Sequence, residues 1–303
     1  GAFIMKSAVA LGLFDGVHSG HRKVIEYPVK LAERGFVPCV LTFSNATLTQ
    51  KQGRSFKYIY TDEQKSRILK SLGIVRIFEV DFNNVKNMSG ESFAAEFLAN
   101  KLNAGWVTCG RDFRFGHNAA CGSDELIELG HKYGFETSVA DDVNIDGEKV
   151  SSNKIRTLLS DGDVAAAARL LGDNYKISGN VVHGYKIGRT LNFPTINQLF
   201  NDGQLTVKYG VYTSQTNING KWLDSVTNVG VKPTIAGNRS PLAETYIIGF
   251  SGNLYDTFTQ VRLIKFLRSE MKFNSLDELK TAMSHDIASS ITILKSTDSS
   301  FTP

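Results

Sequence analysis

The sequence predicts an α/β domain with a parallel sheet, followed by a small antiparallel β-barrel domain with a C-terminal helix. The 303 residues exceed the usual length of one domain and favour two. Up to residue 172, apolar strand-like runs alternate with helical patterns, which is typical of a parallel sheet with crossover helices. Beyond that point, β-branched and aromatic residues alternate between Gly-rich turns, as in antiparallel sheets. We therefore expect two domains, at 1–172 and 173–303.

The first domain contains strand-like and helical segments in alternation. The apolar runs AVALGLF, VPCVLTF, VRIFEV and GWVTCG predict strands, and HRKVIEYPVKLAERG, DEQKSRILKSLG and GESFAAEFLANKL predict helices between them. Pro28 lies inside the first helical pattern. Because an interior proline costs about 3 kcal/mol, we expect a kink or a new turn there. Residues 151–172 predict a serine-capped helix, a Gly-Asp break and an alanine-rich helix.

The second domain shows the signals of antiparallel strands joined by tight turns. In VYTSQTNINGKWLDSVTNVG, the pair Asn219-Gly220 favours a two-residue hairpin turn. The tail SLDELKTAMSHDIASSITIL has a Ser-x-x-Glu start and helical periodicity. A closing helix is therefore expected after the barrel.

Composition limits the functional classes. The 42% hydrophobic and 21% charged fractions are ordinary for a globular protein, and no apolar run approaches the roughly 20 residues that span a bilayer. Cys39, Cys109 and Cys121 are odd in number and show no CxxC spacing, so we predict neither a disulfide framework nor a zinc site. We expect a cytoplasmic protein, monomeric or weakly homo-oligomeric. A net charge of +4 gives little support for a nucleic-acid partner and also suits an anionic small substrate.

The stretch FDGVHSGH places His18 and His21 three residues apart, just after a strand and at a predicted helix start. The unpaired N–H groups and positive dipole end of a helix attract phosphate there. Gly16 and Gly20 leave the backbone open to a nucleotide, and imidazoles can donate hydrogen bonds to charge that grows on an α-phosphate. The pattern alone also allows capping or surface histidines. A metal site is less favoured, because no cysteine or carboxylate cluster accompanies the pair.

Further segments decide between these alternatives. The first half contains, in this order, FDGVHSGH, TDEQKSRILKSLG, MSGESFAAEFL, GRDFRFG at 110–116 and VSSNKIR at 150–156. This series resembles the bacterial bifunctional riboflavin kinase/FAD synthetases, whose corresponding motifs include FDGVHxGH, G-x-DFRFG and ISSTxIR. The resemblance implies a Rossmann-like HxGH nucleotidyltransferase domain that transfers AMP from ATP to FMN, giving FAD and pyrophosphate.

The second half carries a separate signature of the same family. GNVVHGYKIGRTLNFPTIN at 179–197 resembles G-x-V-x-x-G-x-x-x-G-R-x-L-G-F-P-T-A-N, and NVGVKPT at 228–234 and LYDTFTQVRLIKFLRSEMKF match later motifs. A Gly-rich loop leaves backbone amides free for phosphates. Thr195 and Asn197 lie two residues apart on an extended segment, so their oxygens share a side and could hold Mg²⁺. Glu244 matches the glutamate that the family uses as general base toward the 5′-hydroxyl of riboflavin.

The resemblance and the residue chemistry together assign roles along the chain. ATP is the expected co-substrate, Mg²⁺ the cofactor, and riboflavin, FMN and FAD are the expected substrates or products. The assigned residues are Glu244, His18, His21 and Arg156 for catalysis; Gly12, Phe14, Gly16, Gly20, Gly110, Asp112, Ser151, Ser152, Gly179, Gly184, Gly188 and Arg189 for the nucleotide; Phe113, Phe115, Asn228, Arg268 and Phe273 for the flavin; and Thr195 and Asn197 for the metal.

Several positions depart from the family pattern. The segment 44–47, SNAT, stands where the family has an acidic residue and Pro-His-Pro, and Asn153, Asn192 and Tyr246 replace a threonine, a glycine and a histidine. Three alternatives to a bifunctional enzyme follow: a kinase alone, an FAD synthetase alone, or a flavin or nucleotide sensor without turnover. Retention of Glu244 argues against the sensor, because binding alone does not require a base.

Overall fold

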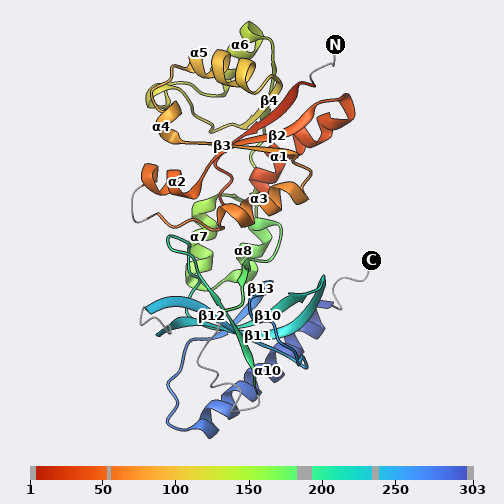
Figure 1. The fold of residues 1–303 in the computed structure, drawn as a ribbon, viewed down its shortest axis with the longest axis vertical. Helices are drawn as coiled ribbons and strands as arrows, with labels where there is room; N and C mark the ends of the chain where they lie inside the picture. The colour runs from red at the N-terminus through yellow and green to blue at the C-terminus, as the bar shows by residue number, and fades with distance from the viewer. Residues whose placement is uncertain (1–4, 53–55, 183–192, 234–238, 299–303) are drawn as a thin grey trace. The chain divides into compact units, whose positions relative to one another are not determined.

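The computed structural model describes residues 5–52, 56–182, 193–233 and 239–298 (Figure 1). The chain divides into two compact units, Gly1–Ser152 and Asn153–Pro303. In this division, residues 153–172 belong to the second compact unit rather than to the first. The predicted domain boundary after residue 172 stays a prediction.

The first unit is built on a five-stranded parallel sheet with the order β3-β2-β1-β4-β5. The strands are β1 (Ser7–Leu11), β2 (Val37–Phe43), β3 (Arg76–Val80), β4 (Ala104–Gly110) and β5 (Glu136–Ala140). All four predicted strands are present. The order reverses between β1 and β4, and in such sheets ligands bind outside the carboxyl ends of the strands at this point.

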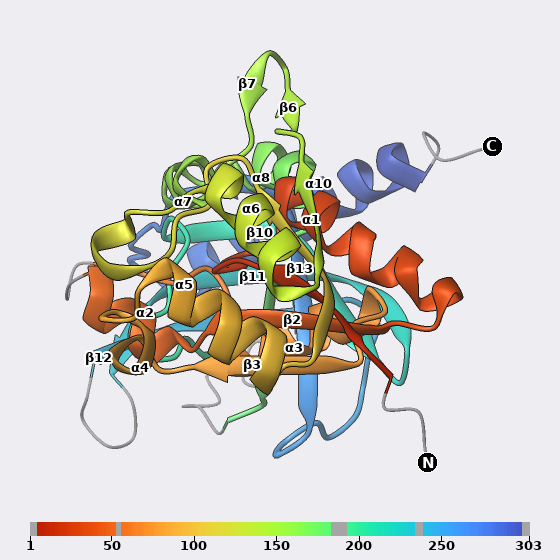
Figure 2. The same ribbon diagram turned by 90° about the horizontal axis from the view of Figure 1, so that it is seen from above.

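Helices cover both faces of this sheet. Helices α1 (Ser19–Lys30) and α3 (Asp62–Ser71) pack against one face, where their apolar residues join Ala10 and Val40. A π-helix (Phe93–Lys101), which follows α5 (Gly90–Ser92), and α6 (Ser123–Tyr133) pack on the other face (Figure 2). The shorter elements are the 3₁₀ helices Leu31–Arg34 and His117–Ala119, α2 (Asn45–Gln52), α4 (Phe82–Val85), β6 (Asn144–Ile145) and β7 (Glu148–Lys149).

The change of helical geometry that we expected at Pro28 comes slightly beyond it. The α-helix continues through Pro28 to Lys30 and then tightens into the 3₁₀ helix Leu31–Arg34. Pro28 is buried within the helix. Because the missing N–H affects only one bond near the end of the helix, the change of geometry comes three residues later.

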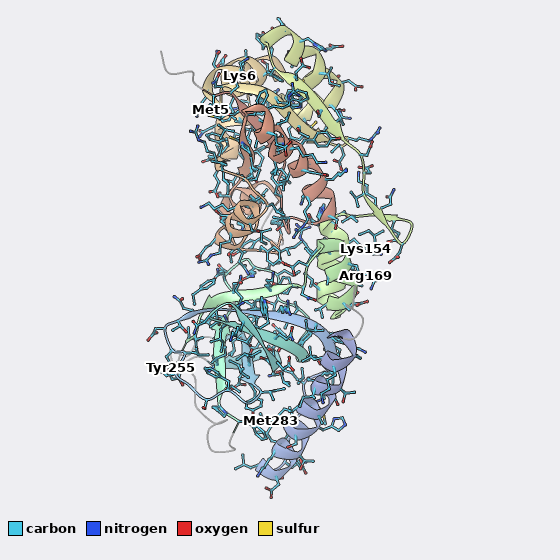
Figure 3. All side chains as sticks on the ribbon, turned by 90° about the vertical axis from the view of Figure 1, so that its right-hand side faces the viewer. Met5, Lys6, Lys154, Arg169, Tyr255 and Met283 are labelled. Carbon is cyan, nitrogen blue, oxygen red and sulfur yellow. The ribbon has the colours of Figure 1, made fainter. Side chains whose placement is uncertain are left out.

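The second unit is a nearly closed antiparallel barrel with the strand order β8-β13-β10-β11-β12-β9. Its elements are α7 (Ser152–Asp161), which begins at the last residue of the first unit, α8 (Val164–Leu171), β8 (Lys176–Asn180), β9 (Thr195–Leu199), β10 (Gly210–Ile218), β11 (Lys221–Pro233), β12 (Arg239–Ile247), β13 (Phe258–Arg268) and α10 (Leu276–Asp298). Lys154 of α7 and Arg169 of α8 are exposed (Figure 3).

Two local sequence signals of this unit are confirmed. Asn219 and Gly220 form the two-residue turn between β10 and β11, both with positive φ (52° and 84°). The Ser275 hydroxyl accepts a hydrogen bond from the N–H of Glu278 at 3.1 Å and caps α10. The predicted barrel with a closing helix is therefore confirmed.

Candidate active sites

The two histidines of the opening motif lie at the first turn of α1, after β1. His18 is the N-cap residue, and its Nδ1 accepts a hydrogen bond from the backbone N–H of His21 at 3.3 Å. The two imidazole rings stack with their centroids 3.6 Å apart and an interplanar angle of 15°. The structure thus brings both predicted histidines into one cluster at a helix N-terminus.

Hydrogen bonding and burial indicate that both rings are neutral. Because Nδ1 of His18 accepts a hydrogen bond, a neutral His18 carries its proton on Nε2. Burial holds the pKa of His21 well below its ordinary value of 6.5, and the electrostatic interaction with His18 and the positive charge of Lys65 lower it further. His21 Nδ1 has no hydrogen-bond partner among the residues that the structure describes. Two neutral imidazoles can each donate one N–H to a phosphate oxygen.

We expect acid to destabilise the first unit through His21. Because its pKa is lower in the folded than in the unfolded chain, the stabilisation is complete above pH 6.5 and is lost as the pH falls from 6.5 toward the lowered pKa. Within that window the free energy of unfolding should fall by up to about 1.4 kcal/mol per pH unit from this residue. Urea unfolding of the wild type and of His21→Ala over this range measures the difference, and equal slopes would contradict the expectation.

Two glycines, one in the motif and one just before it, make room for neighbouring side chains. A Cβ atom at Gly20 would lie 3.1 Å from Cε1 of His18, and one at Gly12 would lie 2.9 Å from Cζ of Phe14. Phe14 is fully buried, and its ring lies edge-on to the His21 ring with the two ring centroids 5.3 Å apart. Phe14 therefore supports His21 from the core, and contacts of Phe14 and Gly12 with a nucleotide stay predictions.

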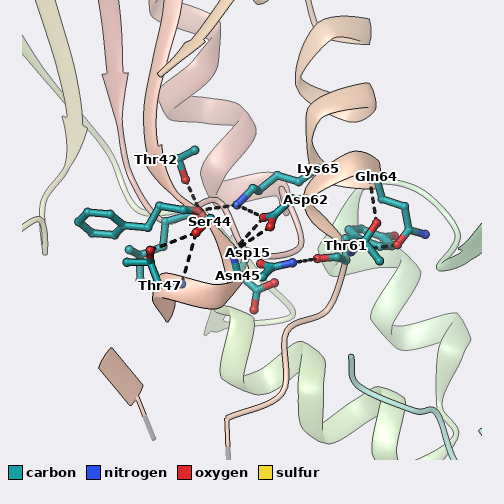
Figure 4. Close-up of polar contacts among 12 residues, drawn as sticks. Asp15, Thr42, Ser44, Asn45, Thr47, Thr61, Asp62, Gln64 and Lys65 are labelled. Carbon is teal, nitrogen blue, oxygen red and sulfur yellow. Dashed lines mark hydrogen bonds and ion pairs between the residues drawn. The ribbon is translucent and has the colours of Figure 1, made fainter. Parts of the chain in front are cut away.

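A buried lysine that the sequence analysis did not single out lies at the carboxyl end of β2 (Figure 4). Lys65 on α3 is 2% exposed and donates to the carbonyl oxygen of Phe43, at the end of β2, at 2.7 Å. Its Nζ is also 3.2 Å from Asp62 Oδ1, and both Asp62 oxygens accept from the N–H of Asn45, at 3.0 and 3.1 Å. Lys65 and Asp62 thus fix the turn from β2 into α2, where the sequence departs from the family.

Removing the Lys65 amine is expected to destabilise the first unit. In Lys65→Met the Phe43 carbonyl loses its buried donor, so we expect a loss of about 1–3 kcal/mol in the free energy of unfolding. Trp106 lies on β4 and Trp222 on β11, so Trp222→Phe leaves one fluorescent reporter in the first unit. Urea unfolding in this background measures the loss. Lys70→Met, at an exposed position of the same helix, is the control, and equal stability of the two variants would contradict the expectation.

The second predicted phosphate signature begins α7. Ser152 donates from Oγ to the backbone carbonyl of Asp15 at 2.9 Å and so contacts the turn that precedes His18. Ser151 directly precedes the helix and is half-buried. Arg156, one turn further along α7, donates to Asn153 Oδ1 at 2.6 Å. Ser152 is therefore in contact with the histidine loop, and Asn153, which departs from the family pattern, holds the arginine.

The segment after β4 contains the residues assigned to nucleotide and flavin. β4 ends at Gly110, and Asp112 is exposed and 3.2 Å from Lys149 Nζ. Phe113 is half-buried and stacks on Phe115 with centroids 5.8 Å apart. Phe115 is 7% exposed and packs in the sheet core. Phe113 is thus the more accessible of the two rings, and the roles of both toward flavin stay predictions.

In the second unit, cross-strand pairing brings the predicted kinase residues together. Glu244 on β12 is paired with Asn228 on β11 and with Asn197 on β9. Thr195 donates from Oγ1 to Glu244 Oε1 at 3.4 Å. Because paired residues of an antiparallel sheet share a face, the four side chains lie on one face of the barrel wall. Glu244 is half-buried rather than fully exposed to solvent.

The Gly-rich segment of this unit is described only in part. Gly179 lies on β8, opposite Thr259 of β13. Gly184, Gly188, Arg189 and Asn192 lie outside the described residues, as does Thr234. Their predicted contacts with nucleotide therefore stay predictions.

Arg268 at the end of β13 is held by an ion pair that we did not predict. Its Nε and Nη2 donate to the two oxygens of Asp286 on α10, at 3.0 and 2.7 Å, and Asp286 is 4% exposed. The guanidinium carbon is 5.9 Å from the centroid of Phe273. A fork-to-fork pair of this kind fixes the arginine plane and joins β13 to α10. Contacts of Arg268 and Phe273 with flavin stay predictions.

Two protein-family models match the chain, one in each half. The FAD synthetase family matches residues 3–154, and the riboflavin kinase family matches residues 171–294. Both families were implied by the motifs, and they occur in the predicted order.

Relatives in bacteria match nearly the whole chain. The bifunctional riboflavin kinase/FMN adenylyltransferase of Pseudomonas fluorescens is 32% identical over 286 residues, covering 92% of this chain and 90% of the relative. The protein of the same name from Bacillus subtilis strain 168 is 34% identical over 291 residues, covering 93% and 90%. A crystal structure titled as a macrolide-efflux protein from Streptococcus pneumoniae aligns with a TM-score of 0.81 at 27% identity, covering 94% and 93%. Among the described residues of this chain, no helix is long and apolar enough to cross a membrane.

Proposed function

The chain belongs to the family of bifunctional riboflavin kinase/FMN adenylyltransferases, and on this premise we propose which of its residues carry out each reaction. The second unit phosphorylates riboflavin to FMN, and the first unit adenylylates FMN to FAD. The observation that carries the assignment is the presence of two separate polar clusters, His18 and His21 in one unit and Glu244 with Thr195 in the other.

In the kinase reaction, Glu244 acts as general base. The 5′-hydroxyl of riboflavin is a poor nucleophile, and a carboxylate within hydrogen-bond reach accepts its proton as the γ-phosphoryl group of ATP is transferred. Thr195 donates a hydrogen bond to one oxygen of this carboxylate and so orients it. Asn228, which pairs with Glu244 across β11 and β12, supplies an amide to the flavin substrate.

The same cluster fits a magnesium ion. Thr195, Asn197 and Glu244 offer a hydroxyl, an amide and a carboxylate oxygen on one face, and Mg²⁺ binds oxygen ligands together with substrate phosphates. When bound, Mg²⁺ neutralises charge that develops on the transferring phosphoryl group. We assign Thr195 and Asn197 as its protein ligands.

In the adenylyl transfer, His18 and His21 stabilise the α-phosphate of ATP as the FMN phosphate attacks it and pyrophosphate leaves. Their neutral rings donate N–H groups from a rigid helix N-terminus, so little reorganisation accompanies the reaction. Ser152 supports the turn before His18, and Arg156 supplies a cation to the phosphates. We propose a cytoplasmic enzyme, monomeric or weakly homo-oligomeric, without a nucleic-acid partner. Three cysteines without CxxC spacing support the compartment, and the mild net charge of +4 supports the absence of a nucleic-acid partner.

A chromatographic time course with riboflavin, ATP and Mg²⁺ tests the proposed function. We expect FMN to form first and FAD to follow, with pyrophosphate released in step with FAD. FMN that accumulates without FAD at high ATP would leave the kinase as the chain's one activity and overturn the assignment of the first unit. No product at all would overturn both assignments.

A further inference from the structure

The barrel is closed between β9 and β8 by few interactions. β9 pairs with β12 from Thr195 to Leu199. On its opposite side the described residues contribute one isolated bridge, in which the N–H of Val182 donates to the carbonyl of Asn197 at 2.8 Å. The Gln198 side chain extends across the remaining gap, and its Nε2 donates to the carbonyl oxygens of Gly179 on β8 and Thr259 on β13, both at 3.0 Å.

The orientation of this amide is determined by its partners. Gln198 is 1% exposed, and because both partners are carbonyl acceptors, only the NH₂ group can face them. Gln198 Oε1 and Thr259 Oγ1 have no hydrogen-bond partner in the described part of the chain. The two Nε2 bonds are therefore the polar contacts that hold this side chain across the gap.

Gln198 joins the two segments that carry the proposed kinase ligands. Successive side chains of a strand point to opposite faces, so Gln198 lies behind the face that carries Asn197. At Gly179, a Cβ atom would meet no atom of the described residues within 4 Å, which leaves that side of the backbone open to a ligand. The Gln198 side chain thus makes no hydrogen bond to Thr195, Asn197 or Glu244. Both of its hydrogen bonds join β9 to the neighbouring strands β8 and β13.

We propose that Gln198 is a positioning residue for the phosphorylation of riboflavin. Its amide holds β9 against β8 and β13, and so keeps Thr195 and Asn197 beside Glu244 and at a fixed distance from Gly179. This rests on the proposed assignment of Thr195 and Asn197 to Mg²⁺. Gln198 lies one residue beyond the motif that the second half shares with the family.

The test replaces the donor and keeps the size of the side chain. In Gln198→Met both hydrogen bonds are lost, and we expect the half-saturating concentrations of Mg²⁺ and of ATP in riboflavin phosphorylation to rise about tenfold. Adenylylation of added FMN should stay at the wild-type rate. Thr259→Val removes a hydroxyl without a described partner, keeps the carbonyl and is the control. If the half-saturating concentrations of Mg²⁺ and ATP were the same in Gln198→Met as in the wild type, the proposal would be overturned, even if the variant were less stable to heat.

A second variant tests the same donor within one folded protein. In Gln198→Glu a protonated carboxyl can donate to one carbonyl and a carboxylate cannot, and burial beside two carbonyls raises the pKa of this new carboxyl. The half-saturating ATP concentration should therefore rise between about pH 5 and 9 more steeply than in the wild type. Parallel profiles would overturn the proposal. A wild type that does not phosphorylate riboflavin would instead overturn the proposed function.

Discussion

Glu244→Gln is expected to slow the phosphorylation of riboflavin by about 10²–10⁴-fold, the usual contribution of a general base. Glutamine keeps the shape of the side chain and can still contact Thr195, but it cannot accept the proton of the 5′-hydroxyl. The loss should therefore appear in kcat, with the half-saturating ATP concentration little changed. The measurement is the initial rate of FMN formation from riboflavin under saturating ATP and Mg²⁺.

Two controls accompany this variant. Adenylylation of added FMN by the same protein should be unchanged, which shows that the first unit is folded and active. Asp202→Asn alters an exposed carboxylate of the same unit and should leave both rates unchanged. Wild-type FMN formation by Glu244→Gln would remove Glu244 from the proposed mechanism.

His21→Ala is expected to slow FAD formation by about 10²–10³-fold. This is the usual effect of removing one hydrogen-bond donor that stabilises negative charge in a transition state. The variant also removes the ring that stacks on His18, so part of the loss reflects a less ordered N-terminus of α1. The measurement is the initial rate of pyrophosphate release from ATP with added FMN. Phosphorylation of riboflavin should be unchanged.

His131→Asn provides the comparison for this variant, because His131 is exposed on α6. We expect it to form FAD at the wild-type rate. If His21→Ala did the same, the adenylyl transfer would have to occur elsewhere in the chain.

Much of the fold follows from local sequence patterns. The apolar runs that predict β1, β2 and β4 are strands, because buried parallel strands require nearly continuous apolar side chains, and the run that predicts β3 is the edge strand of the same sheet. The Asn219-Gly220 turn and the Ser275 cap are equally local signals. The HxxH spacing also predicts the histidine cluster, since residues three apart at a helix start lie on one side.

The interactions that hold the candidate sites could not be predicted in this way. Lys65 bonds to Phe43, Asp286 to Arg268 and Gln198 to Thr259, and each pair is 18 or more positions apart in sequence. Periodicity gives the face on which a residue lies, but not the residue that it contacts on another element. Lys65 appears in sequence as one of several helical lysines, and its burial depends on the packing of α3 against the end of β2.

The most direct test of two independent active sites on one chain is a mixing experiment. Glu244→Gln and His21→Ala are each incubated alone with riboflavin, ATP and Mg²⁺, and then mixed in equal amounts, with FAD measured in all three samples. Neither variant alone should form FAD at an appreciable rate, and the mixture should form it, because FMN released by His21→Ala is the substrate of the intact first unit of Glu244→Gln. A mixture that forms no more FAD than the separate variants would contradict the presence of two separate sites.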